Sequence, residues 1–370
     1  MKKQIIICLF FFIDYHSWSQ LRIITSVPCK DTTILNITGR WVKDRDVIYN
    51  ETLKFTKEQQ QEVNRRIDAL HILFQEAYPK AMGADALWRR FMTHSLFGPE
   101  YNYIVRANEK PKLEIKKGMT VCSYNYKCEI YPYNCSNTSQ KSEAIASYPG
   151  ETGSYIIIYA NELNPLHDRK YSEDTMTING LPVYMRRPVK EMWKGYEILT
   201  DEGGSSTRYV LIHRKGILPY IPVTRKEYLD YCLSSITRFY NKWIADLELY
   251  QPDKEQRKEQ TDAAIKQKNG ELKRFRDELE KTTKANQLDS PAIAFSTTPI
   301  IGTPIFQTEA EGGKMLITEN PAYIRKDLPK YIPQLFVLYW NWMNDKPSHH
   351  FMEMLEANFP IEKLQAMIDK

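Results

Sequence analysis

Histidine, acidic and serine side chains at short spacings are the residues of this sequence that could do chemistry. His350 and Glu353 are three residues apart, with His349 adjacent, and side chains at this spacing share one face of a helix. They could contact one metal ion, but a protein site needs three or four ligands and the sequence supplies no further ligand nearby. We therefore expect no metal centre and no bound cofactor.

A glycine-serine run offers a potential nucleophile. Ser205 follows Gly203 and Gly204, and its activation would need a base such as His213, eight residues later across a hairpin. A hairpin loop is the commoner meaning of such a run. The sequence also lacks nucleophile elbows, paired-histidine metal helices, phosphate-binding glycine loops and nucleotide fingerprints. It favours a non-catalytic binding or structural role, and the alternative is a hydrolase that acts on glycan or peptide.

Tyrosine is frequent, with 24 of the 370 residues. Tyr124 and Tyr126 precede Cys128, and Tyr131 and Tyr133 follow it. Residues two apart in a strand project to one face, so the four phenol rings could form a disulfide-braced platform that stacks on a sugar or peptide. The alternative is that these tyrosines cover a small hairpin. Among the candidates in the sequence, the platform is the best surface for a ligand.

The N-terminus has the pattern of a cleavable signal peptide. Lys2 and Lys3 precede an apolar run at residues 5–13, and Ser17 and Ser19 are small residues at the −3 and −1 positions of a cut before Gln20. The apolar run is too short for a membrane span, which takes roughly 20 residues, and no later segment is long and apolar enough. We therefore expect an exported protein without a transmembrane anchor.

Five cysteines would remain after cleavage, namely Cys29, Cys122, Cys128, Cys135 and Cys232. Exported proteins meet an oxidising compartment, so pairing is expected. Cys232 lies on the apolar face of a predicted helix and is expected to stay a buried free thiol. The other four would form two disulfides in one of three connectivities. A zinc site is the alternative, but Cys-x5-Cys-x6-Cys lacks the two-residue spacing of paired zinc ligands.

The charge balance is mild. The 51 Lys and Arg residues exceed the 46 Asp and Glu residues by five, and removal of residues 1–19 lowers that excess by one. Both signs are interspersed along most of the chain, whereas nucleic-acid binding requires clustered Lys and Arg. We expect no nucleic-acid partner.

The elements that must position these residues are helices at both ends and strands between them. Thr56 and Gln59 form a capping box before a helix whose apolar stripe runs from Val63 to Ala77. A shorter helix is expected at residues 86–96, followed by strands and by a tight hairpin at Asn179-Gly180. The expected strands are residues 101–106, 119–126, 154–159, 183–185, 195–199 and 208–213.

A second capping box, Thr224 with Glu227, begins a long helical segment. Pro252 breaks this segment, and Asn269-Gly270 is a possible second interruption. Residues 253–283 carry many charges of both signs, which is typical of a solvated amphipathic helix; the alternative is a partner-binding coiled coil. Residues 286–312 are expected as a connection, before a strand at 335–340 and two terminal helices. The predicted units are residues 1–19, 20–223, 224–285 and 286–370. Together they predict an α+β fold, with a curved, mostly antiparallel sheet packed by amphipathic helices and a long helical excursion.

Two runs carry a resemblance to a known group. The first run is residues 218–229 (LPYIPVTRKEYL), and the second is residues 320–323 (NPAY), continuing through Leu328-Pro329 to Pro333-Gln334. Both runs are similar to segments of uncharacterised exported proteins of the Bacteroidota. The similarity covers about a tenth of the chain and implies location in the envelope or outside the cell, but no activity. Because no terminal β-domain for type IX secretion is seen, we expect the periplasm rather than the medium. The expected partner is a glycan, a peptide or another envelope protein.

Overall fold

The computed structural model describes residues 24–28, 33–44, 46–48, 56–92, 124–138, 141–146, 154–167, 176–201, 207–297 and 302–370. The predicted signal peptide, Cys29, Cys122, Ser205 and the strand expected at 101–106 lie outside these residues.

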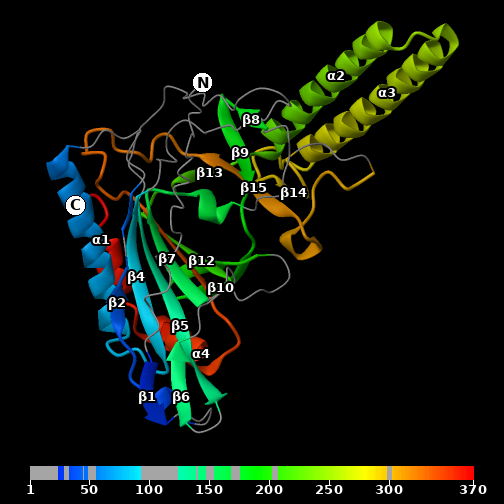
Figure 1. Ribbon diagram of the computed structural model, residues 1–370. Helices are drawn as coiled ribbons and strands as arrows, with labels where there is room; N and C mark the ends of the chain where they lie inside the picture. Colours follow the sequence, from blue (N-terminus) through cyan, green and yellow to red (C-terminus); the bar gives the residue numbers. More distant parts are fainter. Residues whose placement is uncertain are drawn as a thin grey trace, which may run out of the picture.

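The larger of two sheets is almost entirely antiparallel (Figure 1). Its successive neighbours are β1 (Ile24–Pro28), β6 (Lys141–Ala146), β5 (Tyr124–Thr138), β7 (Ser154–Ala160), β16 (Phe336–Asn341), β12 (Arg208–Ile212), β11 (Tyr196–Leu199) and β10 (Val189–Trp193). The first part of β5 also pairs with β4 (Ala84–Met92), to which β2 (Trp41–Lys43) and β3 (Val47–Ile48) add in parallel. Strand β16 therefore enters the middle of a sheet whose other strands come from much earlier in the chain.

The smaller sheet has the order β13 (Tyr220–Pro222), β15 (Lys314–Glu319), β9 (Leu181–Met185) and β8 (Thr177–Ile178), and β14 (Ile293–Ala294) also pairs with β15. The predicted hairpin at Asn179-Gly180 joins β8 to β9. Both turn residues have positive φ, 53° and 77°, as a type I′ turn requires.

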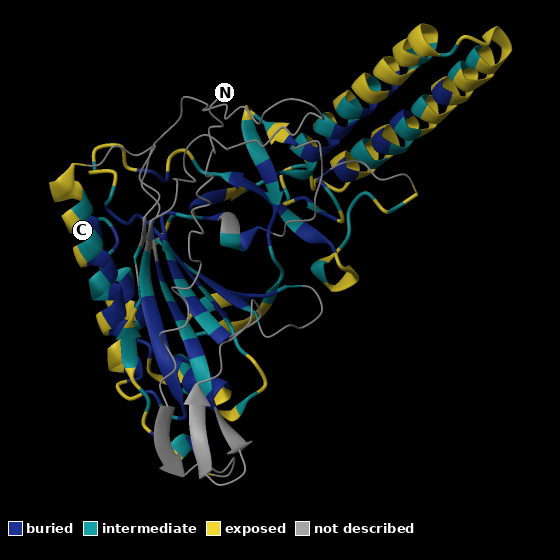
Figure 2. Ribbon diagram, in the orientation of Figure 1, coloured by how far each residue is buried: buried dark blue, intermediate teal, exposed yellow. Residues whose placement is uncertain are grey.

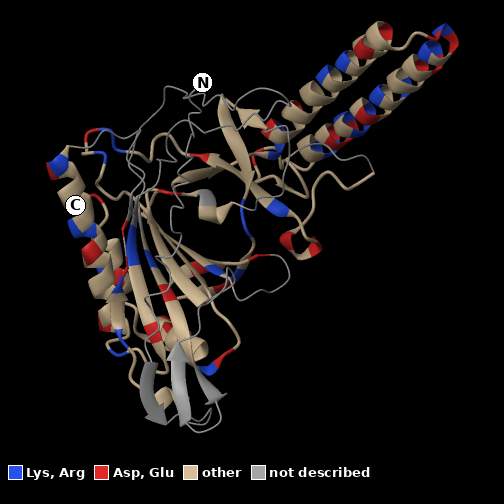
Figure 3. Cartoon of the chain, viewed as in Figure 1, with Lys and Arg blue, Asp and Glu red and all other residues tan. Residues whose placement is uncertain are grey.

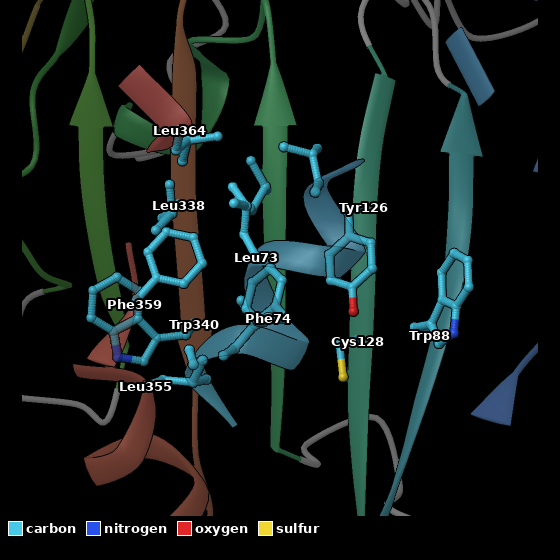
Figure 4. Packing of buried hydrophobic residues seen from close by; sticks show 14 of the residues in the cluster. Leu73, Phe74, Trp88, Tyr126, Cys128, Leu338, Trp340, Leu355, Phe359 and Leu364 are labelled. Atoms are coloured by element: carbon cyan, nitrogen blue, oxygen red, sulfur yellow. The ribbon is translucent and has the colours of Figure 1, made fainter. Parts of the chain in front are cut away.

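Three helices cover one face of the larger sheet, namely α1 (Lys57–Ala77), α4 (Lys346–Asn358) and α5 (Ile361–Gln365). Helix α1 begins at the predicted capping box, in which Thr56 Oγ1 accepts from the Gln59 backbone N–H. Figure 4 shows the core that these helices close, where Phe74 of α1 lies beside Tyr126 of β5 and Phe359 follows α4. Every large apolar side chain removed from water here contributes about 1.5–3 kcal/mol.

Helices α2 (Arg225–Tyr250) and α3 (Lys254–Lys284) form an antiparallel pair that projects from the body beside the smaller sheet (Figure 1). We call this pair the arm. Its base is buried with β9 and β15, while most of its distal half is exposed (Figure 2). Short 3₁₀ helices complete the described elements at η1 (Ile34–Asn36), η2 (Asn164–Leu166) and η3 (Glu309–Glu311).

The structure confirms the α+β fold with a mostly antiparallel sheet, packing helices and a helical excursion. Two local predictions were wrong. The helix expected from residue 86 is strand β4, because its side chains alternate: Ala84, Ala86 and Trp88 face the core and Asp85 does not. Helix α3 also continues through Asn269-Gly270 without interruption.

The cysteine predictions have mixed outcomes. Cys232 is a buried free thiol on α2, as predicted. Cys128 was predicted to form a disulfide, but it is also a buried free thiol, because it faces α1 from an inner strand of the sheet. Burial raises the pKa of the Cys128 thiol. Only the backbone of Cys135 is described, and it lies in strand β5, whereas we expected residues 122–135 to form a cysteine-containing loop at the margin of the sheet.

The two runs that resemble exported proteins meet in space. Asn320 donates from Nδ2 to the Leu218 carbonyl at 2.9 Å, and its backbone N–H bonds to Pro219. In the second run, the Gln334 backbone N–H donates to Asn161 Oδ1 at 2.7 Å, at the start of β16. These residues join the smaller sheet and the arm to the larger sheet.

Among the described residues, no helix combines the length and apolar character needed to cross a membrane.

His71 is an ionisable group inside the main core. It is 8% exposed, stacks on Trp88 with ring centroids 4.0 Å apart, and its Nδ1 lies 3.1 Å from the Tyr126 hydroxyl. Burial lowers its pKa from 6.5 to about 4, against a smaller opposing effect of Asp68. His71 is therefore neutral in the folded protein at neutral pH.

We predict that this histidine makes stability depend on pH. The contribution of neutral, buried His71 to the free energy of unfolding is fully present above the unfolded-state pKa of 6.5. It is lost as pH falls towards the folded-state pKa, because the unfolded chain takes up the proton first. Between pH 7.5 and 5 the loss should be about 2 kcal/mol, measured by urea unfolding. The H71Q variant should lack this part of the pH dependence, whereas H349Q, at an exposed histidine, should keep it. Equal slopes in the wild type and H71Q would contradict the assignment.

Candidate functional site

The predicted tyrosine platform does not exist as an exposed surface. Tyr124 and Tyr126 are fully buried and Tyr133 is 1% exposed. The reason is that β5 is one continuous inner strand, so Tyr124 and Tyr126 face α1 while Tyr131 and Tyr133 point to the opposite side. Tyr133 donates to Asp85 Oδ1 at 2.6 Å, and Tyr131 is half-buried. The prediction was wrong for three of the four residues.

The opposite face of the same strands carries a different group of tyrosines. Tyr155 of β7, Tyr339 of β16 and Tyr209 of β12 lie on the face that α1 does not cover, and we call them the tyrosine strip. The Tyr155 and Tyr339 hydroxyl oxygens are 2.5 Å apart, and Tyr339 stacks on Tyr209 at 4.6 Å between ring centroids. Tyr155 and Tyr339 are half-buried, whereas Tyr209 is 5% exposed.

Charged side chains of β4 and β5 border the half-exposed end of the strip. Glu129 is directly across from Tyr155 in the sheet and binds both Lys127, at 2.8 Å, and Arg89. Arg89 also reaches Asp44 at 3.4 Å, and the Lys127 ammonium lies 5.5 Å from the Tyr155 ring centroid. This end therefore presents carboxylate, ammonium and guanidinium groups beside a phenol.

A second ion pair borders the covered end. The Arg187 guanidinium lies 4.2 Å from the Tyr209 ring centroid and pairs with Asp201. Asp201 also accepts from Thr207 Oγ1 at 2.7 Å and lies 3.3 Å from the Tyr209 hydroxyl. At this end Arg187, Asp201 and the Tyr209 hydroxyl therefore each have a polar partner.

The ionisable groups of the strip have pKa values away from neutrality. Burial, with the hydrogen bond to Tyr339, raises the pKa of Tyr155, and burial also raises the pKa of Tyr339. Burial alone would raise the pKa of Glu129, but Lys127 and Arg89 outweigh it and hold that pKa below its usual value. Since an efficient general acid or base has a pKa near the working pH, this arrangement suits hydrogen bonding better than proton transfer.

The other chemical candidates of the sequence form no site among the described residues. Ser205 lies outside the described residues, and Nδ1 of His213 is 2.7 Å from the Arg214 carbonyl. His349 contacts Asn344 at 3.1 Å, and His350 lies edge-on to Tyr78. In the part of the chain that is described, no group of three His, Cys, Asp or Glu residues could hold a metal ion.

A groove of about 310 Å³ lies at the base of the arm. Arg225, Glu278, Lys281 and Phe306 line it, and its charged groups are engaged within the wall. Arg225 bonds Gln287 at 2.5 Å and covers Phe306, and Lys281 pairs with Glu278 at 3.4 Å. The groove differs from the tyrosine strip in that Phe306 is the one aromatic side chain among its lining residues.

The chain has no significant match among protein-family models, curated proteins or solved structures.

The strip was missed although its strands were predicted. In residues 154–160 buried side chains alternate with half-buried ones, and Tyr155 is one of the half-buried set. This alternation indicates that Tyr155 points away from the core. The sequence contains no signal that this strand pairs with the strand of Tyr339, or that the strand of Tyr209 is the next one in the sheet. Alternation could have indicated the face of Tyr155, but not its neighbours.

We predict that Glu129 stabilises its two cations. The E129Q variant leaves Lys127 and Arg89 with less opposing charge in a partly buried site and should lower the free energy of unfolding by about 1–3 kcal/mol. Because the pKa of Glu129 is lowered, the difference should be present above the ordinary carboxyl pKa and disappear as pH falls through the folded-state value.

Urea unfolding measures this difference. The control is E76Q, at an exposed pair in which Glu76 lies 2.7 Å from Lys363; exposed pairs contribute about 0–1 kcal/mol. If E129Q were no more harmful than E76Q, Glu129 would not have the assigned role.

Proposed function

We propose that the protein is an exported, non-catalytic binding protein of the cell envelope, and that the tyrosine strip holds a carbohydrate. The observation that carries the proposal is the contact of Tyr155 with Tyr339 on the sheet face opposite α1, where both rings are half-buried, next to Glu129, Lys127 and Arg89. Sugar rings offer hydroxyl groups for such polar side chains and apolar C–H faces for phenol rings.

A carbohydrate fits the strip better than an extended peptide does. Peptides that bind to sheets commonly add a strand at an unpaired edge, where the backbone supplies the hydrogen bonds. The strip lies instead on the face of inner strands, and β5, β7, β16 and β12 are each paired on both sides along this region. Its available groups are side chains, which suit the hydroxyl groups of a sugar.

The pKa directions favour binding over hydrolysis. A glycan hydrolase ordinarily needs two carboxyl groups with separate acid and base roles. On the strip Glu129 is held ionised by two cations, and the neighbouring phenols are held protonated. A hydrolase acting on glycan or peptide is therefore the alternative that the binding assay must also examine, by measuring product release.

We predict that binding on a glycan array depends on the two phenol hydroxyls. The double variant Y155F/Y339F keeps both rings and removes both hydroxyls, so affinity for the glycans bound by the wild type should fall roughly tenfold. The matched control is Y250F, at a tyrosine of the arm that is 75% exposed, and it should bind as the wild type does. Unchanged binding by the double variant, absence of any bound glycan, or release of cleaved product would each reject the proposal.

Export is supported by the pattern of residues 1–19, and the periplasm is the location that we propose for the exported protein. We predict that the native protein begins near Gln20, because the cut follows Ser19. N-terminal peptide mass spectrometry of the periplasmic, cytoplasmic and medium fractions measures this directly. An intact Met1 in cytoplasmic protein would reject export, and protein found mainly in the medium would reject the periplasm.

A further inference from the structure

The distal half of the arm has an exposed aromatic stripe. Phe239, Trp243 and Tyr250 of α2 are 62%, 36% and 75% exposed. Their spacings of four and seven residues place them along one side of the helix. Single exposed apolar residues are ordinary, but three aromatic side chains in line on a projecting helix form a surface for another helix. We call them the aromatic stripe.

Helix α3 does not cover this stripe. The seam between α2 and α3 is formed by other residues, including Ile236 and Tyr240 of α2 and Ala264 and Leu272 of α3. Trp243 contacts Tyr240 at the margin of that seam, with ring centroids 5.8 Å apart. The arm thus has one packed seam and, beside it, three aromatic side chains of α2 that the described elements leave exposed.

The charges beside the stripe indicate its partner. Lys242 and Asp246 are exposed and one turn apart, on the same side of α2 as the stripe. Lys242 lies two residues before Ile244 and Asp246 two residues after it. When a second α2 is turned to run in the opposite direction about this level, each positive charge therefore faces a negative one. A second α2 running antiparallel places Lys242 next to Asp246 of the other copy, twice, and Phe239 next to Tyr250. A parallel approach would place like charges together.

We propose that two copies of this chain associate through the aromatic stripe, with the two α2 helices antiparallel around a two-fold axis near Ile244. Such an interface uses the same patch on both copies, so each contact occurs twice. The two arms then pack as four helices, with lengthwise contacts of the kind found in helix bundles. The charges of both signs along the arm (Figure 3) are compatible with two arms side by side. This inference is independent of the carbohydrate proposal.

A charge-exchange experiment tests the pairing. In K242D or D246K alone, both symmetric contacts of a homodimer become like-charged, so the dissociation constant in sedimentation equilibrium should rise roughly tenfold or more. An equimolar mixture of the two variants restores both opposite-charge contacts and should form heterodimers. F239S should also weaken the dimer, because it removes one aromatic side chain from the contact.

The matched controls are K258D and D262K. These residues have the same charges and the same spacing on α3, and both are exposed; their variants should dimerise as the wild type does. Circular dichroism should show unchanged helix content for all variants. The proposal would be overturned by a wild type that stays monomeric at micromolar concentrations, by dimers indifferent to K242D and D246K, or by a mixture without heterodimers.

Discussion

The alternation of side chains across the central strands is the constraint on which the rest of this structure depends. In β5, β7 and β16, residues such as Tyr126, Ile156 and Leu338 face the helices and form the main core. The residue next to each one must then point to the other side, which is how Tyr155 and Tyr339 reach the face opposite the helices. A shift of one residue in the pairing would exchange the two sets, burying charge and exposing the core. The core and the candidate site are therefore opposite sides of one set of strands.

The order of the strands is the second requirement. Strand β16 comes from the last part of the chain and lies between β7 and β12, so the strip exists only when the C-terminal segment is in place. Asn161, with φ of 58°, holds the entry of β16, because its Nδ2 donates to the Ile332 carbonyl and its Oδ1 accepts from the Gln334 backbone N–H. Helices α4 and α5 follow and close the core against α1. The core and the strip therefore both require the C-terminal segment.

The two surfaces proposed for recognition differ in their physical basis. The strip is a network of satisfied polar groups on a rigid sheet, where hydrogen bonds and ring contacts would provide affinity. The aromatic stripe of α2 is apolar, and its association would depend on removal of aromatic area from water, with Lys242 and Asp246 setting the direction. The stripe lies on the projecting part of the arm (Figure 1), whereas the strip lies on the larger sheet, so two copies joined by their arms would each keep their own strip.

Local signals in the sequence determined much of the secondary structure. Thr56 and Thr224 with their capping partners defined where α1 and α2 begin, and Asn179-Gly180 defined a hairpin, because these features depend on neighbours within three residues. At residues 86–92 the sequence predicted a helix where the structure has a strand, because the spacing of Ala86, Leu87 and Phe91 suits both. Only the tertiary structure decided that Tyr124 and Cys128 are buried and that Tyr155 meets Tyr339. Burial and contact of this kind depend on which distant strands pair, and period-two alternation specifies the two faces of a strand but not what covers either of them.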